Sequence, residues 1–168
     1  MNMKKVTFAG DPVTLPDVEI KVGDRAPDFV VMDKDMSPVK LADFAGTVRI
    51  LSIVPSVDTG VCAIQTRRFN EDANAIADRK VLTVSVDLPF ALGRWCAAEG
   101  LDNIIALSDH KDLSVGEAYG VTMKEHRLLT RAVFVIDSTG MVVYAEYVPE
   151  VTDHPDYDAA LIAAKHAK

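Results

Sequence analysis

The stretch VRILSIVPSVDTGVCAIQTRRF, residues 48–69, decides the fold of this chain. Its first part, 48–54, is a nearly continuous run of β-branched and aliphatic side chains, as expected for a strand that is buried on both faces of a sheet. Pro55 ends this strand. Further on, apolar residues recur at helical spacing, which predicts a helix over 60–78. A fully buried strand followed directly by a helix is typical of a parallel β–α–β unit.

The same pattern repeats further along the chain. Residues 81–86 form a second predicted buried strand, and Pro89 suits the first turn of a helix that runs to about Ala98. Gly100 is the expected stop for that helix, and 104–107 is a short third strand. The other predicted elements are a hairpin over 6–15 with its connection at 9–12, strands at 29–32 and 39–41, a short helix over 113–119, a hairpin of 132–136 with 141–145, and a helix over 157–167 capped between 153 and 156.

This order of elements predicts the fold class. The first half needs a right-handed parallel crossover, whereas the second half is antiparallel. A mixed central sheet flanked by helices on both faces is therefore expected, which is the arrangement of a thioredoxin-like α/β fold. We expect one domain over 1–168, with an N-terminal β-hairpin extension over 1–20, because the length suits a single domain and no linker divides the chain.

The composition excludes several classes of function. The chain has 168 residues, of which 49% are hydrophobic and 26% charged, and its formal net charge is −7. The acidic balance argues against nucleic-acid partners and against an anionic membrane surface. No stretch is long and apolar enough to span a membrane, and acidic residues and prolines interrupt the segment after the N-terminal lysines, so we expect no signal peptide. We therefore expect a cytoplasmic protein.

The two cysteines are the strongest chemical signal. In a reducing cytosol they are more often catalytic, metal-binding or buried than permanently bridged. Cys62 falls in the first turn of the predicted helix over 60–78, where unpaired N–H groups and the helix dipole stabilise a thiolate. The same position also suits a small buried hydrophobic residue. On this helix Val61 and Ile64 fall on the face expected to pack on the sheet, and Gln65 falls away from it.

The second cysteine, Cys96, lies late in the second predicted helix, 34 residues after Cys62. Taken alone, it suits an inert core position. Cys62 is followed by Ala63, Ile64 and Gln65, so it does not begin a Cys-x-x-Cys motif, and the chain lacks the vicinal dithiol of disulfide oxidoreductases. If both cysteines react, they do so from two consecutive helices.

Six segments of the chain carry a resemblance to a known family. They are FAGDPVTL (8–15), PSVDTGVC (55–62), VDLPFA (86–91), RWCAAEGL (94–101), AYGV (118–121) and RAVFVID (131–137). The second segment contains the motif Pro-x-x-x-Thr-x-x-Cys. Together these segments resemble the bacterial thiol peroxidases of the Tpx type, a branch of the atypical 2-Cys peroxiredoxins, over nearly the whole chain.

The resemblance implies a peroxidase and a role for each of five residues. Cys62 is then the peroxidatic cysteine and Cys96 the resolving cysteine, while Thr59 and Arg131 support the site and Pro55 shields it. The family implies reduction of hydrogen peroxide and organic hydroperoxides, an intramolecular disulfide between the two cysteines, thioredoxin as the reductant, and a homodimer. It implies no haem, metal, nicotinamide or other cofactor.

The chemistry suits these residues, although each supporting residue has a plainer alternative. Peroxide reduction needs a thiolate and a group that stabilises charge as the O–O bond breaks. The fixed charge and donor fork of Arg131 suit both needs, but an Arg at the start of a strand is also a common surface residue. The Thr59 hydroxyl, one helical turn from Cys62, suits either bonding to the sulfur or capping the helix. Pro55 either walls the pocket or only ends the strand.

A disulfide requires Cα atoms within roughly 7 Å of each other. Since Cys62 begins one helix and Cys96 ends the next, we expect one helix end to unwind locally before they bridge. Two other functions stay open: a thiol–disulfide exchange protein, against which the missing Cys-x-x-Cys argues, and a non-catalytic redox-sensing partner. The four histidines show no metal-site spacing and are expected at the surface; they are His110, His126, His154 and His166.

Overall fold

The middle of the structure is a seven-stranded sheet whose strand order is β11-β10-β5-β6-β7-β3-β4. The computed structural model describes residues 4–74, 79–99 and 105–168. All six side chains of the inner strand β5 are buried, as its nearly continuous apolar pattern predicts. The three parallel strands are β5 (Val48–Ile53), β6 (Arg79–Ser85) and β7 (Ile105–Ser108).

The outer strands of this sheet are antiparallel to their neighbours. Two of them, β10 and β11, form the predicted hairpin, and β10 also pairs with β5. On the other side, β3 pairs with β7 and with β4. The prediction of a mixed sheet is therefore confirmed. The bounds are β3 (Val30–Met32), β4 (Pro38–Lys40), β10 (Ala132–Ile136) and β11 (Val142–Tyr147).

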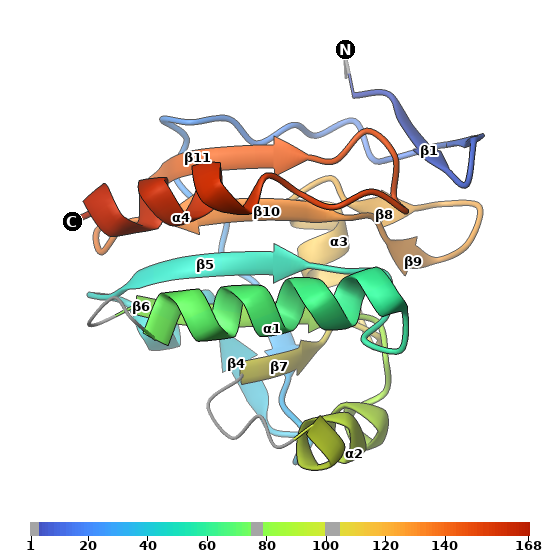
Figure 1. The fold of residues 1–168 in the computed structure, drawn as a ribbon, viewed down its shortest axis with the longest axis horizontal. Coiled ribbons are helices and arrows are strands. Elements are labelled where there is room, and N and C mark those ends of the chain that lie inside the picture. The colour runs from blue at the N-terminus through green and yellow to red at the C-terminus, as the bar shows by residue number, and fades with distance from the viewer. Residues whose placement is uncertain (1–3, 75–78, 100–104) are drawn as a thin grey trace.

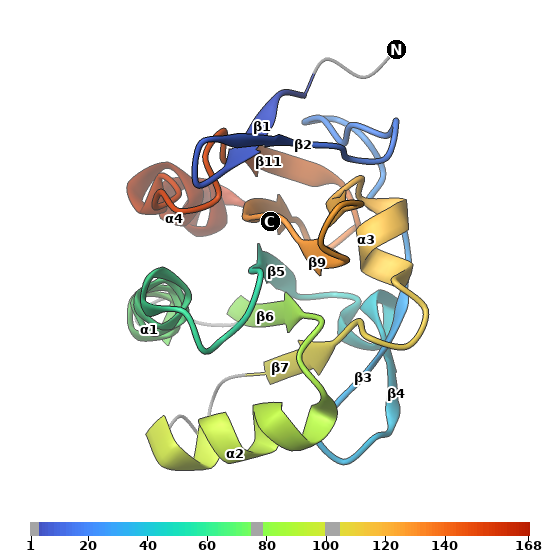
Figure 2. The ribbon, with the colours of Figure 1, turned by 90° about the vertical axis from the view of Figure 1, so that its right-hand side faces the viewer.

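Helices cover both faces of the sheet, as expected. Figure 2 shows α1 and α4 side by side on one face and α3 on the other, while α2 packs beside β7. The predicted cap of the last helix is present, since the Asp156 carboxylate accepts a hydrogen bond from the Ala159 N–H. The helices, also labelled in Figure 1, are α1 (Gly60–Asn74), α2 (Pro89–Glu99), α3 (Ser114–Ala118) and α4 (Tyr157–His166).

Three sequence predictions lie outside the described residues. They are the end of the first helix near 78, the helix stop at Gly100 and the start of the third parallel strand at 104. Several short elements were not predicted, because they are too short to show a periodicity. These are the 3-10 helix η1 (Leu41–Phe44), which begins where a strand was predicted to end, and the two-residue strands β8 (Thr122–Met123) and β9 (Leu128–Leu129).

The N-terminal hairpin has a tighter turn than predicted. Its strands β1 (Val6–Phe8) and β2 (Asp11–Val13) are joined by Ala9 and Gly10 alone. Both turn residues have positive φ, 52° and 88°, as a two-residue hairpin turn requires for its twist to match that of the strands. The predicted connection was too long, because it included the first two residues of β2.

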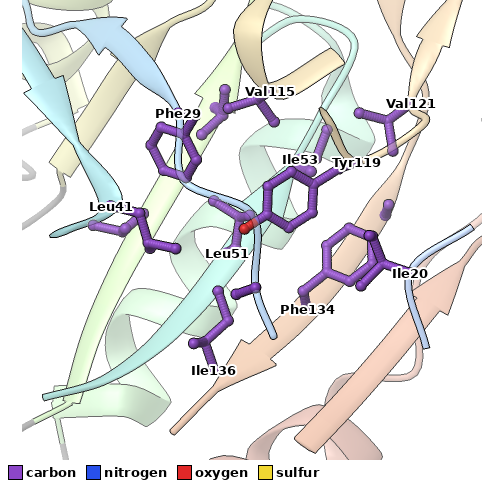
Figure 3. Close-up of a cluster of buried hydrophobic side chains, with 14 of the residues drawn as sticks. Ile20, Phe29, Leu41, Leu51, Ile53, Val115, Tyr119, Val121, Phe134 and Ile136 are labelled. Carbon is purple, nitrogen blue, oxygen red and sulfur yellow. The ribbon is translucent and has the colours of Figure 1, made fainter. Parts of the chain in front are cut away.

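The main core lies between the sheet and α3 (Figure 3). The ring centroids of Tyr119 and Phe134 are 5.2 Å apart, and Phe29 packs edge-on against Tyr119 at 6.2 Å. The Tyr119 hydroxyl donates to the Pro27 carbonyl at 2.7 Å, so the polar end of this buried ring has a partner.

Three smaller clusters of buried side chains accompany the main core. One, around Phe69 and Ile50, lies beneath α1 and α4. A second joins Val6, Met123 and Val151. The third lies between the start of α1 and α2, and we call it the Cys62 cluster. Its members are Val54, Val57, Cys62, Leu92, Trp95 and Ala106, with Cys96 packed against them.

Candidate active site

The loop that leads from β5 into α1 is fixed by a carboxylate of the neighbouring strand. Asp87, just after β6, accepts hydrogen bonds from the Ser56 hydroxyl and the Val57 N–H, both at 2.8 Å. The Ser85 hydroxyl also donates to this carboxylate at 2.7 Å. Pro55, where the loop begins, is buried. Asp87 was not predicted as a site residue, although its place at the carboxyl end of the strand next to β5 is a usable signal.

The helix N-terminus is capped by Thr59. Its hydroxyl oxygen accepts a hydrogen bond from the Cys62 N–H at 3.2 Å, and the hydroxyl donates to the Ser56 carbonyl at 3.4 Å. Of the two roles considered for this residue, the structure shows the capping role. Thr59 therefore fixes the backbone from which the thiol projects.

The Cys62 thiol is fully buried and faces a guanidinium. Arg131, immediately before β10, is 2% exposed, and its Nη1 lies 3.3 Å from Cys62 Sγ. The alternative of a surface position for Arg131 is therefore wrong. Its Nε donates to the Val151 carbonyl at 2.7 Å, so the guanidinium is held from both ends.

The helix α1 buries a polar residue that the sequence analysis placed on the wrong face. Gln65 is fully buried, whereas Ile64 is 50% exposed. Arg131 Nη1 donates to Gln65 Oε1 at 2.8 Å, and Gln65 Nε2 donates to the Ser52 hydroxyl on β5 at 2.8 Å. The prediction failed because the amide finds partners at the sheet, which lets it replace an apolar side chain there. Its position one turn after Cys62 was the signal that could have found it.

The thiol lies beside a buried cation at the start of a helix. Among the described residues, no Asp or Glu forms an ion pair with Arg131. Its partners are two amide-type oxygens and the sulfur. The guanidinium therefore keeps its charge available to groups that meet at the sulfur.

The structure brings the second cysteine to the same cluster from the next helix. Cys96, on α2, is half-buried and packs against the Cys62 cluster, and both cysteines are free thiols. Burial raises the pKa of the Cys96 thiol, with Lys34 opposing the effect. Cys96 is therefore a thiol rather than a thiolate at neutral pH.

The described residues were also compared with the patterns of a metal site and of a membrane-spanning helix. Within 4–74, 79–99 and 105–168, no three metal-binding side chains come together. In the same part of the chain, every helix is too short or too polar to cross a bilayer. His126, His154 and His166 are exposed as predicted, and His110 is half-buried.

Comparisons with known proteins identify the family. A family model described as Redoxin matches residues 21–161. The chain is 59% identical over 165 residues to the thiol peroxidase of Listeria monocytogenes, covering 98% of this chain and 100% of the relative. It is 56% identical over 163 residues to the thiol peroxidase of Bacillus subtilis, covering 97% and 98%. A solved structure of a peroxiredoxin-like protein from Aquifex aeolicus matches with a TM-score of 0.90 and 39% identity over 96% of each chain.

These matches confirm the thioredoxin-like fold, which is that of a peroxiredoxin. More narrowly, the chain belongs to the bacterial thiol peroxidases.

Proposed function

We propose that this protein reduces hydroperoxides through Cys62 and that Cys96 completes the cycle within the same chain. The thiol peroxidase relatives support the activity. The observation that carries the residue assignment is the 3.3 Å contact between Arg131 Nη1 and the buried Cys62 Sγ at a helix N-terminus. This contact meets two needs of the reaction, because it favours a thiolate and places a fixed cation where charge moves.

The first step is attack of the Cys62 thiolate on one peroxide oxygen. The S–O bond forms and the O–O bond breaks, so sulfur is oxidised to a sulfenic acid and the second oxygen leaves as alkoxide or hydroxide. The leaving oxygen then takes a proton and departs as alcohol or water. Arg131 donates to the sulfur before the step and stabilises the leaving oxygen during it. Thr59 fixes the Cys62 backbone, and the buried Pro55 walls the site without offering an N–H of its own.

The second step closes a disulfide. The Cys96 sulfur attacks the sulfenic sulfur of Cys62, the S–S bond forms, and hydroxide leaves and combines with the thiol proton as water. Because Cys62 begins α1 and Cys96 lies near the end of α2, local unwinding of one helix end brings them within disulfide distance. An external dithiol then reduces the disulfide, and thioredoxin fills this role in our proposal.

Several finer features come from the family alone. The protein acts on organic hydroperoxides as well as hydrogen peroxide, needs no cofactor, and works as one domain over 1–168. It forms a homodimer and serves antioxidant defence in the cytoplasm. The names of its relatives do not favour the thiol–disulfide exchange or redox-sensing alternatives.

The direct test is a single oxidation followed by mass analysis. Fully reduced protein receives one equivalent of cumene hydroperoxide, and its intact mass and a non-reducing peptide map are recorded. We expect rapid loss of two hydrogens per chain with a Cys62–Cys96 crosslink, and the Cys96→Ser variant should instead gain one oxygen at Cys62. A thiol count that stays unchanged after minutes would overturn the peroxidase assignment, and reduction of insulin by the protein would favour the exchange alternative.

A further inference from the structure

The segment 148–152, on the far side of Arg131 from the thiol, holds this residue in place. The Val151 carbonyl accepts from Arg131 Nε at 2.7 Å, and the Val148 N–H donates to the Arg131 carbonyl at 3.0 Å. The backbone and the guanidinium of Arg131 are therefore both tied to one short segment after β11. Any shift of this segment moves the donor that faces Cys62.

This segment is in turn fixed by the Glu150 carboxylate, which accepts five hydrogen bonds. Two of the donors belong to the segment itself, the N–H of Thr152 at 2.7 Å and its hydroxyl at 2.6 Å. The other three belong to the N-terminal hairpin of β1 and β2: the Thr7 hydroxyl at 2.9 Å, the Gly10 N–H at 2.8 Å and the Ala9 N–H at 3.2 Å. These donors lower the pKa of Glu150 to about 2, so the carboxylate is fully charged at neutral pH.

Backbone contacts and packing join the same two pieces of chain. The Thr7 N–H donates to the Pro149 carbonyl and the Val151 N–H donates to the Thr7 carbonyl, both at 2.9 Å. The Val151 side chain is 1% exposed and packs in a cluster with Val6 and Met123. Val151 therefore contacts the hairpin through its N–H and its side chain, and contacts Arg131 through its carbonyl.

We propose that Glu150 is a positioning residue for peroxide reduction, and that the N-terminal hairpin serves to hold segment 148–152 so that Arg131 stays aimed at Cys62. This rests on the role proposed above for Arg131. It gives a function to a part of the chain that does not reach the thiol. A displacement of an electrostatic group by even a fraction of an ångström weakens its effect on the transition state.

A second glutamate provides a matched control. The Glu125 carboxylate accepts from the Thr14 N–H at 2.7 Å, so it also ties the hairpin region to the body of the protein. This contact is with residue 14 and not with segment 148–152. Glu125→Ala removes a contact of residue 14 and leaves every contact between the hairpin and segment 148–152 in place, whereas Glu150→Ala removes three of those contacts.

The experiment measures the oxidation of reduced protein by hydrogen peroxide in a stopped-flow instrument. Trp95 belongs to the Cys62 cluster and reports the step by fluorescence. We expect Glu150→Ala to slow this step roughly tenfold. Glu150→Gln keeps one acceptor oxygen and should fall between Ala and wild type, while Glu125→Ala should stay within about twofold of wild type.

A double-mutant cycle separates positioning from general destabilisation. If Glu150 acts through Arg131, Glu150→Ala should have no further effect on the rate in an Arg131→Met background, since there is no guanidinium left to position. Equal slowing in both backgrounds would overturn the proposal, and so would a Glu150→Ala rate equal to that of wild type. Thermal melts show whether each variant folds. If Glu150→Ala does not fold, Glu150→Gln takes its place in the cycle. If wild type itself does not react with peroxide, the proposed function has failed rather than this inference.

Discussion

Replacing Gln65 by Glu tests whether Arg131 and Cys62 are coupled electrically. The substitution keeps the size and shape of the side chain, and the new carboxylate can still accept from Arg131 Nη1. The Ser52 hydroxyl, which accepts from the amide in the native protein, can turn and donate instead. The change is therefore mainly one of charge, placed beside the only cation that contacts the thiol among the described residues.

The size of the effect follows from two distances. Nη1 lies 2.8 Å from Gln65 Oε1 and 3.3 Å from Cys62 Sγ, so oxygen and sulfur are at most about 6 Å apart. Two negative charges at that separation repel by about 3 kcal/mol at an effective dielectric constant near 20. The introduced carboxylate would pair with the guanidinium and offset its charge at the sulfur and at the leaving oxygen. We expect peroxide oxidation of the Gln65→Glu variant at neutral pH to slow by about ten- to a hundredfold.

The assay is the stopped-flow measurement of Trp95 fluorescence at pH 7. Gln65→Met is the control, because it removes the same hydrogen bonds without adding a charge. We expect it to lose about 1–3 kcal/mol of stability but less activity than Gln65→Glu. If Gln65→Glu reacts within about threefold of wild type, the electrostatic coupling inferred from these distances is absent.

Three further outcomes follow from the site and its surroundings. Thr59→Val removes the helix cap and should cost about 1 kcal/mol in urea unfolding, while Thr59→Ser should not. Burial raises the pKa of the Cys96 thiol, so disulfide formation should accelerate as the pH rises above neutrality, and a flat pH profile would contradict this. Burial also raises the pKa of Asp109 to about 6 in the folded protein, from an ordinary 3.8. The folded state thus binds a proton at Asp109 more tightly than the unfolded state does. The protonated carboxyl contributes stability that is complete below about pH 4 and is lost as the pH rises through 6, which lowers the free energy of unfolding by up to about 3 kcal/mol. Urea midpoints across this range should show a smaller fall with pH in Asp109→Asn than in wild type.

The parts of the fold that the sequence predicts well are those with strong periodicity. The strand over 48–53 is buried on both faces, and no local feature competes with that interpretation. The turn between β1 and β2 is predicted less well, because a two-residue turn with positive φ at Ala9 is set by the twist of the strands rather than by residue type. The strands β8 and β9 pair with each other as a short hairpin and are two residues each, too short to show an alternating pattern.

The candidate site divides in a similar way. The position of Cys62 at a helix start could be predicted, because it depends on local order along the chain. The burial of Gln65 and Arg131 could not, since each is buried with partners that other elements supply, the Ser52 hydroxyl for Gln65 and the Val151 carbonyl for Arg131, as well as with the other. Hydrophobic periodicity assigns both to the surface, and the resemblance to a family identified only Arg131.

The small size of the Cys62 cluster has a consequence for how the protein unfolds. None of its members belongs to the two larger clusters that hold the sheet to α3 and to α4. The two thiols thus pack in a cluster apart from the two that hold most of the sheet. Opening of the helix ends around this cluster would expose few side chains, so we expect the rest of the fold to survive it. Amide hydrogens at the start of α1 and along α2 would then exchange with solvent by such openings, while those of β5 and β10 would wait for the whole chain to unfold.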